Sequence, residues 1–268
     1  MKYDIVKDKL AFFITLFPFL RKVFYKLLNC LILRQQYVLN IIKKIYPDKN
    51  SSFKMYDAGG GYLQYTDFVL STYPNAEVFA VDIKNDYIED YYYYIKKKNK
   101  HLNFRHHCAD LQTYIPKESY DLIIAIDILE HIENDRDVLS NFHKVINDSG
   151  KLLISTPSTF DEAAAFTEEH VRPGYDVNDL IEKLKTAGFK IDKAQYTYGK
   201  FGALYWKMAM KTPLLMLNKS NWNFLLLPIY YLFTFPVFHL LMKIDQACNN
   251  KIGNGILVVA SKNEVSKI

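Results

Sequence analysis

Three consecutive glycines, Gly59, Gly60 and Gly61, follow a run of β-forming residues that ends at Asp57. Glycine lets the backbone turn tightly and approach a ligand without a Cβ clash. The helix expected after the turn offers free backbone N–H groups to a polar or anionic ligand. A dinucleotide fingerprint would need another glycine at position 64, where the chain has Gln64. The turn therefore predicts a ligand loop and disfavours a nicotinamide dehydrogenase, and a purely structural tight turn is the alternative.

Acidic residues follow three successive expected strands: Asp57 after the first, Asp82 after the second and Asp110 after the third. In a doubly wound sheet the carboxyl ends of adjacent strands meet at one edge, where ligands bind. An acid after the second strand suits ribose hydroxyls, and an acid after the third suits an exocyclic amine such as that of adenine. Any one of them alone is more often a solvated loop residue, but three in register predict a single nucleoside site.

Strand-like and helix-like segments alternate from residue 53, which predicts an α/β fold: a Rossmann-like sheet with helices on both faces. The expected strands are residues 53–57, 77–81, 102–105, 122–126, 152–156, 190–197 and 255–260. The expected helices are residues 63–73, 86–98, 134–147 and 177–187. Asp176 is the expected N-cap of the last helix and Gly188 its expected stop. The sixth strand is expected to run parallel to the first five.

The first fifty residues carry ten Lys or Arg and three Asp, a net charge of +7, so the remainder holds about −2 of the total +5. Basic and apolar residues alternate from 10 to 45 with helical spacing. This pattern predicts a pair of basic amphipathic helices lying on a membrane surface, with Pro18 and Pro47 as breaks. The apolar run 10–20 is too short to span a bilayer. Helices that simply cover the sheet are the alternative.

A second apolar block, residues 201–252, separates the last two expected strands. Within it, residues 223–242 contain no Lys, Arg, Asp or Glu over twenty positions, which meets the length criterion for a membrane span. The prolines in the block favour short broken helices; they are Pro213, Pro228 and Pro236. Because the last strand must return to the same sheet, we expect a membrane hairpin or an in-plane pair of helices. A buried helical subdomain or a dimer interface is the alternative.

The three cysteines, Cys30, Cys108 and Cys248, are odd in number and widely spaced, which favours reduced thiols in a cytosolic protein. With the apolar blocks, this predicts a cytoplasmic protein that is peripherally or monotopically associated with a membrane. We expect three regions: a basic helical region 1–50, a catalytic domain 51–200 plus 253–262, and an apolar helical insertion 201–252.

Five motifs together carry a resemblance to a known family. They are the glycine turn 57–61, the acids Asp82 and Asp110, the segment 120–132 with Asp127-Ile-Leu-Glu-His-Ile, the segment 149–157, and the stretch 169–172 with 187–189. On these motifs the chain from about 53 to 197, plus 255–260, resembles class I S-adenosylmethionine-dependent methyltransferases. Within that class it is similar to the group of quinone-ring O-methyltransferases. It departs at Leu63, where many members have a third glycine.

The resemblance implies a seven-stranded methyltransferase sheet that binds S-adenosyl-L-methionine. The implied cofactor-binding residues are Asp57, Ala58, Gly59, Gly60, Gly61, Asp82, Ile83, Asp110, Leu111 and Asp127. A hydroxyl acceptor benefits from a general base, and His131 and His170 are the candidate catalytic residues because both are expected in loops at the ligand edge. For each, a structural histidine is the alternative, and His106 and His107 are expected to be structural.

A divalent cation is a further cofactor that the resemblance raises, since the quinone-ring group is thought to use one at an acid-x-x-Glu-His pattern. Asp127, Glu130 and His131 match that pattern, but a packing role for Leu-Glu-His is the favoured interpretation, so no metal ligand is assigned. The expected acceptor is a hydrophobic or membrane-embedded small molecule or lipid, entering beside the apolar block.

Two other functions remain open from the sequence. A nucleic-acid methyltransferase is disfavoured because Asp127-Ile-Leu-Glu stands where base methylation needs Asp/Asn-Pro-Pro-aromatic, and because the basic residues sit among apolar ones. We therefore expect no nucleic-acid partner. A degenerate methyltransferase fold acting as a membrane scaffold or partner subunit is the non-enzyme alternative, with Leu63 as its support.

Overall fold

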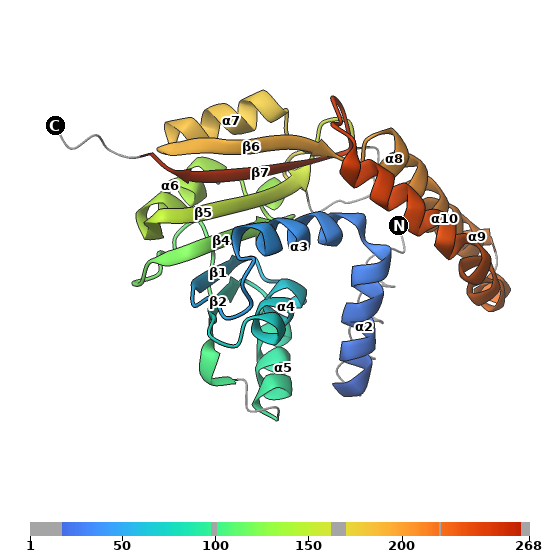
Figure 1. Ribbon diagram of the computed structural model, residues 1–268, viewed down its shortest axis with the longest axis horizontal. Coiled ribbons are helices and arrows are strands. Elements are labelled where there is room, and N and C mark those ends of the chain that lie inside the picture. The colour runs from blue at the N-terminus through green and yellow to red at the C-terminus, as the bar shows by residue number, and fades with distance from the viewer. Residues whose placement is uncertain (1–17, 98–100, 162–169, 220, 264–268) are drawn as a thin grey trace.

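The computed structural model describes residues 18–97, 101–161, 170–219 and 221–263, and these contain one seven-stranded sheet with the order β3-β2-β1-β4-β5-β7-β6 (Figure 1). The strands are β1 (Lys54–Ala58), β2 (Glu77–Asp82), β3 (Phe104–Cys108), β4 (Tyr120–Ile126), β5 (Ile146–Pro157), β6 (Phe189–Thr197) and β7 (Gly255–Lys262). All neighbouring pairs among β1 to β5 are parallel, and β7 is antiparallel to both β5 and β6. As predicted, β6 therefore runs parallel to the first five strands.

Helices cover both faces of the sheet, as predicted. One face carries α3 (Leu33–Ile45), α4 (Gln64–Thr72) and α5 (Asn85–Lys96), and the other carries α6 (Asp135–Val145) and α7 (Val177–Thr186). Successive residues of the central strands point to opposite faces, so Ile124 joins one buried cluster and Ile123 the other. Parallel strands that are buried on both faces read as continuous apolar runs, and this is why the segment 122–126 is apolar throughout.

The start of α7 agrees with the sequence-based prediction, whereas the start of β3 differs from it. The Asp176 carboxylate accepts hydrogen bonds from the backbone N–H groups of Asn178 (2.8 Å) and Asp179 (3.3 Å), which confirms the predicted N-cap of α7. The third strand begins at Phe104, two residues later than predicted, because residues 101–103 form a 3-10 turn with Leu102 81% exposed. Leu102 was included in the predicted strand because it is apolar, but it lies outside the strand.

The N-terminal region forms two helices, α2 (Pro18–Leu31) and α3, and the predicted residues 10–17 lie outside the described part of the chain. Helix α2 is described from Pro18 onward, so the predicted break there stays a prediction. The described chain breaks at Ile32, whose backbone is extended, and α3 ends at Ile45, two residues before Pro47. Val38 and Ile42 of α3 are fully buried, so this helix covers the sheet. In α2, by contrast, Val23 and Leu27 are about half exposed.

A helical arm connects β6 to β7 and projects from the edge of the sheet (Figure 1). It consists of α8 (Lys200–Trp206), η4 (Lys207–Lys211), α9 (Thr212–Lys219), η5 (Asn221–Leu226) and α10 (Leu227–Ala247). By length and composition, α10 is the one helix of the described residues that passes the test for a membrane span, and only 17% of its apolar window is buried. Chain topology places both ends of the arm together, because Thr197 pairs with Gly255.

The prolines of the arm act differently from one another. Pro228 lies in the first turn of α10, where a missing N–H is harmless. Pro213 lies directly after the π-helical segment η4, and the helical backbone continues from η4 into α9 without a break. The prediction that Pro236 breaks the helix is wrong, since α10 continues through it. Phe238, Leu241 and Met242 follow it on the buried face, and their packing holds the helix beyond the proline.

Candidate active site

The carboxyl ends of the parallel strands bring the predicted acids to one edge of the sheet. Asp57 is buried and accepts a hydrogen bond from the Thr66 hydroxyl at 2.6 Å. Burial raises the pKa of Asp57 to about 7, against the lowering effect of the Thr66 hydrogen bond. Asp57 is thus a desolvated carboxylate whose ionised form a cation would favour.

The glycine turn leads from β1 to α4, is hydrogen-bonded to the end of β2, and leaves one surface open. The N–H of Gly59 donates to Val81 O at 2.8 Å, and the N–H of Gly61 donates to Asp82 Oδ2 at 2.9 Å. A Cβ on Gly59, at φ +77°, would lie 2.5 Å from Ile128 Cγ1. At Gly61, with φ +51°, a Cβ would meet no atom within 4 Å. Only glycine fits the first position, and the second allows a ligand to approach the backbone closely.

Leu63, where the sequence departs from the family pattern, adopts the left-handed conformation that a glycine would take easily, with φ 58° and ψ 28°. Its side chain is fully buried, and a Cβ on Gly60 would lie 2.6 Å from Leu63 Cδ2. Burial of a leucine contributes about 1.5–3 kcal/mol, which offsets a backbone strain of about 1–3 kcal/mol. The loop geometry therefore survives the substitution.

Other residues with the strained left-handed backbone conformation lie at the same carboxyl-terminal edge of the sheet. Among the described non-glycine residues, positive φ occurs at Leu63, Asp127 and Tyr198, which follow β1, β4 and β6. Such strain costs free energy and concentrates at ligand sites.

The acids after β2 and β3 hold their loops by local hydrogen bonds. Asp82 Oδ1 accepts from the N–H of Lys84 at 2.8 Å, and the neighbouring Ile83 side chain is 68% exposed. Asp110 Oδ1 accepts from the N–H of Gln112 at 2.9 Å, and Leu111 is buried between them. Asp82 pairs with Cys108 in the sheet register, so Asp110 lies two residues beyond Asp82 at the same edge.

Arg34 is a site residue that the sequence did not point to. Its guanidinium reaches from α3 to the carboxylate of Asp127 and forms an ion pair there. The guanidinium also lies 5.9 Å from the ring centroid of Tyr198. The Tyr198 hydroxyl accepts a hydrogen bond from the backbone N–H of Arg34 at 3.1 Å. Arg34 Nε and Asp127 Oδ1 are buried and have no hydrogen-bond partner among the described residues. A buried, unpaired donor and acceptor are costly unless a ligand satisfies them.

His131 and His170 meet at this edge, with ring centroids 4.6 Å apart and planes at 78°. Potential ligand atoms of Glu130, His131 and His170 all lie within 4.8 Å of one another. Glu130 is buried, and its Oε2 accepts from the Thr156 hydroxyl at 3.0 Å. Burial and the nearby Asp127 charge raise the pKa of Glu130. Asp127 of the predicted acid-x-x-Glu-His pattern is not part of this trio, because it pairs with Arg34.

Arg172, also missed as a site element, clamps the two histidine-bearing loops together. Its Nη1 donates to Leu129 O and Ile132 O, each at 2.7 Å, and its backbone N–H donates to Glu130 O at 3.3 Å. The clamp fixes His131 and His170 relative to each other. A basic residue two positions after His170 was the available signal.

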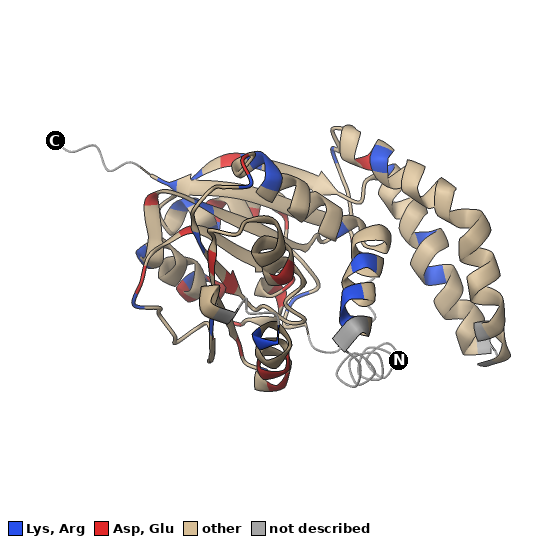
Figure 2. Cartoon of the chain, turned by 60° about the horizontal axis from the view of Figure 1, so that its bottom comes forward, with Lys and Arg blue, Asp and Glu red and all other residues tan. Residues whose placement is uncertain are grey.

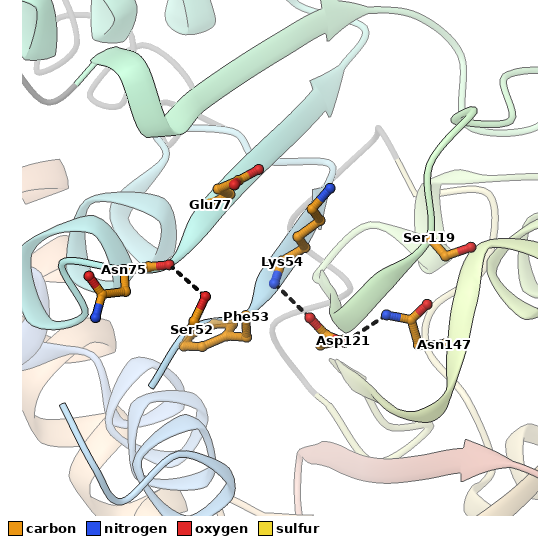
Figure 3. A pocket seen from close by; sticks show the side chains of 8 residues that line it. All are labelled: Ser52, Phe53, Lys54, Asn75, Glu77, Ser119, Asp121 and Asn147. Carbon is orange, nitrogen blue, oxygen red and sulfur yellow. Dashed lines mark hydrogen bonds between the residues drawn. The ribbon is translucent and has the colours of Figure 1, made fainter. Parts of the chain in front are cut away.

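A polar pocket of about 390 Å³ lies at the opposite edge, around the amino ends of β1 and β2 (Figure 3). There Asp121 accepts hydrogen bonds from the Lys54 N–H at 2.8 Å and the Asn147 side chain at 2.6 Å. Its polar side chains thus bond to one another, and none of the predicted site residues lines it.

The model of a methyltransferase domain matches residues 56–152, which contain the glycine turn, the three acids, Asp127 and His131. In this segment the chain is similar to S-adenosylmethionine-dependent methyltransferases. The chain is 27% identical over 166 residues to a malonyl-[acyl-carrier protein] O-methyltransferase of Paenibacillus sp., covering 56% of the chain and 60% of the relative. It is also 27% identical over 125 residues to a ubiquinone biosynthesis O-methyltransferase of Rickettsia bellii, covering 46% of the chain and 50% of the relative. The chain thus spans roughly half the length of these curated relatives.

A solved structure with the same fold is the N-methyltransferase NodS from Bradyrhizobium japonicum, in complex with S-adenosylhomocysteine. The match has a TM-score of 0.53 at 12% identity, and it covers 88% of this chain and 91% of NodS. At that identity the match establishes the fold.

Proposed function

We propose that this chain transfers the methyl group of S-adenosylmethionine to an oxygen atom of a hydrophobic small molecule. The observation that carries the proposal is the unsatisfied pair at the end of β4. Arg34 Nε needs an acceptor and Asp127 Oδ1 needs a donor. A zwitterionic amino-acid group supplies both, its carboxylate to the arginine and its ammonium to the aspartate. The methionine end of the cofactor is such a group.

The rest of the edge suits the remainder of the same ligand. Gly61 allows close backbone approach, and the ionised form of Asp57 is favoured by a neighbouring cationic group. Asp82 has lone pairs beyond its two backbone hydrogen bonds for ribose hydroxyls. Ile83, which is 68% exposed, offers an apolar surface for a base, and Asp110 an acceptor for its amine. The matched relatives of Paenibacillus and Rickettsia are O-methyltransferases.

The protein's own chemical task is to position the acceptor and take its proton. The bound cofactor supplies an electrophilic methyl group, and the acceptor oxygen forms the new C–O bond as the C–S bond breaks. The acceptor's proton goes to the unprotonated nitrogen of His131 or His170. Arg172 holds these rings in place by its bonds to the loop carbonyls.

A divalent cation would be held by Glu130, His131 and His170 and would polarise the acceptor oxygen. The two histidines alone suffice for the proton transfer proposed here, and Asp127 is already paired with Arg34. We therefore assign the base role to the histidines without a metal.

The test uses the full chain, S-adenosylmethionine labelled in its methyl group, and a lipid extract of the source cell, followed by mass analysis of the labelled product. Labelling of a lipid-soluble compound, retained in excess chelator, supports the proposal. Loss of labelling in chelator with recovery on Mg²⁺ or Zn²⁺ would overturn the metal-free base. Binding of the cofactor with labelling only of nucleic acid would overturn the acceptor class, and no cofactor binding would favour a scaffold.

A further inference from the structure

An apolar stripe runs along one face of α10 in the helical arm. Its five exposed members, spaced three or four residues apart or adjacent, are Ile229 (56%), Leu232 (72%), Phe233 (74%), Val237 (46%) and Leu240 (58%). This spacing puts them on one side of the helix. The opposite side buries Phe238, Leu241 and Met242 against the protein. The stripe thus faces away from the core.

The tip of the arm extends the exposed apolar surface. Its members are Leu215 (54%), Trp222 (80%), Leu225 (63%) and Leu226 (51%). Large contiguous apolar patches are rare on soluble monomers and mark interaction sites. A tryptophan at such an edge is typical of the membrane interface.

The charge on this region has one sign. Residues 200–252 contain six Lys and one acid, Asp245, which is fully buried. Helix α2, at the same end of the molecule, adds exposed Lys22 and Lys26 beside half-exposed Val23 and Leu27 (Figures 1 and 2). Basic residues near an anionic membrane are attracted to its headgroups.

We propose that the helical arm docks in the plane of an anionic lipid bilayer, with the α10 stripe in the acyl boundary and the lysines at the headgroups. The depth follows from two contacts: the Tyr230 and Tyr231 hydroxyls donate to Met208 O and Ala209 O, each at 2.7 Å. Lys207 and Lys211 therefore lie beside the first turns of α10, where the stripe begins. A spanning arm would have to carry both ammonium groups through hydrocarbon, whereas an in-plane arm leaves them in the headgroup layer.

A second copy of the chain fits this surface less well than lipid. Two stripes packed face to face would bring two sets of lysines together with no exposed acid of the arm to compensate them. Anionic headgroups neutralise the same charges. Because the arm joins the sheet at Thr197 and Gly255, docking also brings the cofactor edge to the bilayer. A lipid-soluble acceptor can then enter from the membrane, a consequence that rests on the proposed function.

The binding test uses the full chain with vesicles of phosphatidylcholine alone or of equal parts phosphatidylcholine and phosphatidylglycerol, in flotation assays. Binding to the anionic vesicles is expected. It should fall roughly tenfold or more in Leu232→Ser/Phe233→Ser, which removes two apolar side chains of the stripe, and in Lys207→Gln/Lys243→Gln, which removes two charges. The matched control Leu102→Ser changes a leucine that is 81% exposed in the 3-10 turn at residues 101–103 and should bind normally. Equal binding to both vesicle types, or undiminished binding of the stripe variant, would overturn the proposal.

The orientation test uses Trp222 fluorescence in a Trp206→Phe background with lipids brominated near the headgroup or near the chain end. Strongest quenching by the shallow label is expected, and strongest quenching by the deep label would overturn the in-plane orientation. Absence of vesicle binding together with a sedimenting dimer, dissociated by the stripe substitutions, would assign the stripe to a second copy. Titration with S-adenosylhomocysteine in the same samples reports separately on the proposed function.

Discussion

The guanidinium of Arg34 on α3 and the carboxylate of Asp127 beyond β4 form an ion pair across 93 positions of the sequence. The pair joins the N-terminal helices to the edge of the sheet at which the acids meet. It also leaves one buried polar atom on each partner without a hydrogen bond among the described residues. We interpret the pair as a preformed site for the zwitterionic end of the cofactor.

Replacing Arg34 is expected to weaken cofactor binding. In Arg34→Gln, the affinity for S-adenosylhomocysteine measured by calorimetry should fall roughly 10- to 100-fold, since a charged hydrogen bond contributes about 1.5–3 kcal/mol. Arg34→Lys should recover only part of it, because an ammonium lacks the planar fork. The control Arg105→Gln removes a surface ion pair with Glu118 and should bind normally. Unchanged affinity in a folded Arg34→Gln protein would refute this role.

Cofactor affinity is expected to depend on pH through Asp57. With a pKa of about 7 in the free protein, this carboxyl is largely protonated at pH 6, and a cationic ligand favours its ionised form. The ligand should therefore bind more tightly as the pH rises from 6 to 8, with proton release that calorimetry in two buffers detects. Asp57→Asn should remove most of that proton release. A pH-independent affinity in the wild type would contradict the burial of a proton at this site.

The raised pKa of Asp57 also makes the free energy of unfolding of the ligand-free protein depend on pH. Between the unfolded pKa near 3.8 and the folded pKa near 7, the folded state holds a proton that the unfolded chain has released. The contribution of Asp57 to the free energy of unfolding therefore falls as the pH rises through this window.

Loss of either facing histidine is expected to slow the chemical step without affecting cofactor binding. For His131→Gln and His170→Gln, kcat should fall about 100-fold or more on the acceptor identified by the methyl-labelling experiment, because this is the usual contribution of a general base. The control His107→Gln alters a ring that packs on Tyr114 at 4.6 Å, outside the pair. If neither variant changes kcat or its pH profile, the histidines are structural and another group takes the proton.

The sequence predicted the strands, the helices and the edge at which the acids meet, because β-periodicity and helix caps are local signals. Arg34 was missed since only tertiary packing brings α3 to β4. Tyr198 was missed although it follows a strand at the ligand edge, as Asp82 does. Pro236 was misjudged because packing of the next turn outweighs a local helix-breaking preference. The roles of the cofactor residues remain predictions.

Buried hydrogen bonds to Asp245, where the helical arm meets the rest of the protein, are expected to contribute to the stability of the fold. Its carboxylate accepts from the Tyr37 hydroxyl at 2.8 Å and the Gly202 N–H at 2.9 Å, joining α3, α8 and α10. Tyr37→Phe should lower the free energy of unfolding by about 1–3 kcal/mol in urea titrations, because the buried carboxylate loses a donor. Gly202→Ala should cost more, since its Cβ would lie 2.8 Å from Asp245 Oδ2. Tyr93→Phe, at a side chain that is 60% exposed, is the control. Equal stability of all three variants would show that the hydrogen bonds to Asp245 do not stabilise the fold.

The cofactor site itself is tested by calorimetric titration of S-adenosylhomocysteine into the full-length protein and its Asp82→Asn variant. We expect one molecule bound per chain, with the affinity reduced roughly tenfold or more in Asp82→Asn, since the ribose hydroxyls lose a charged acceptor. No binding to the folded wild type, or equal binding to both proteins, would contradict a nucleoside held at the end of β2.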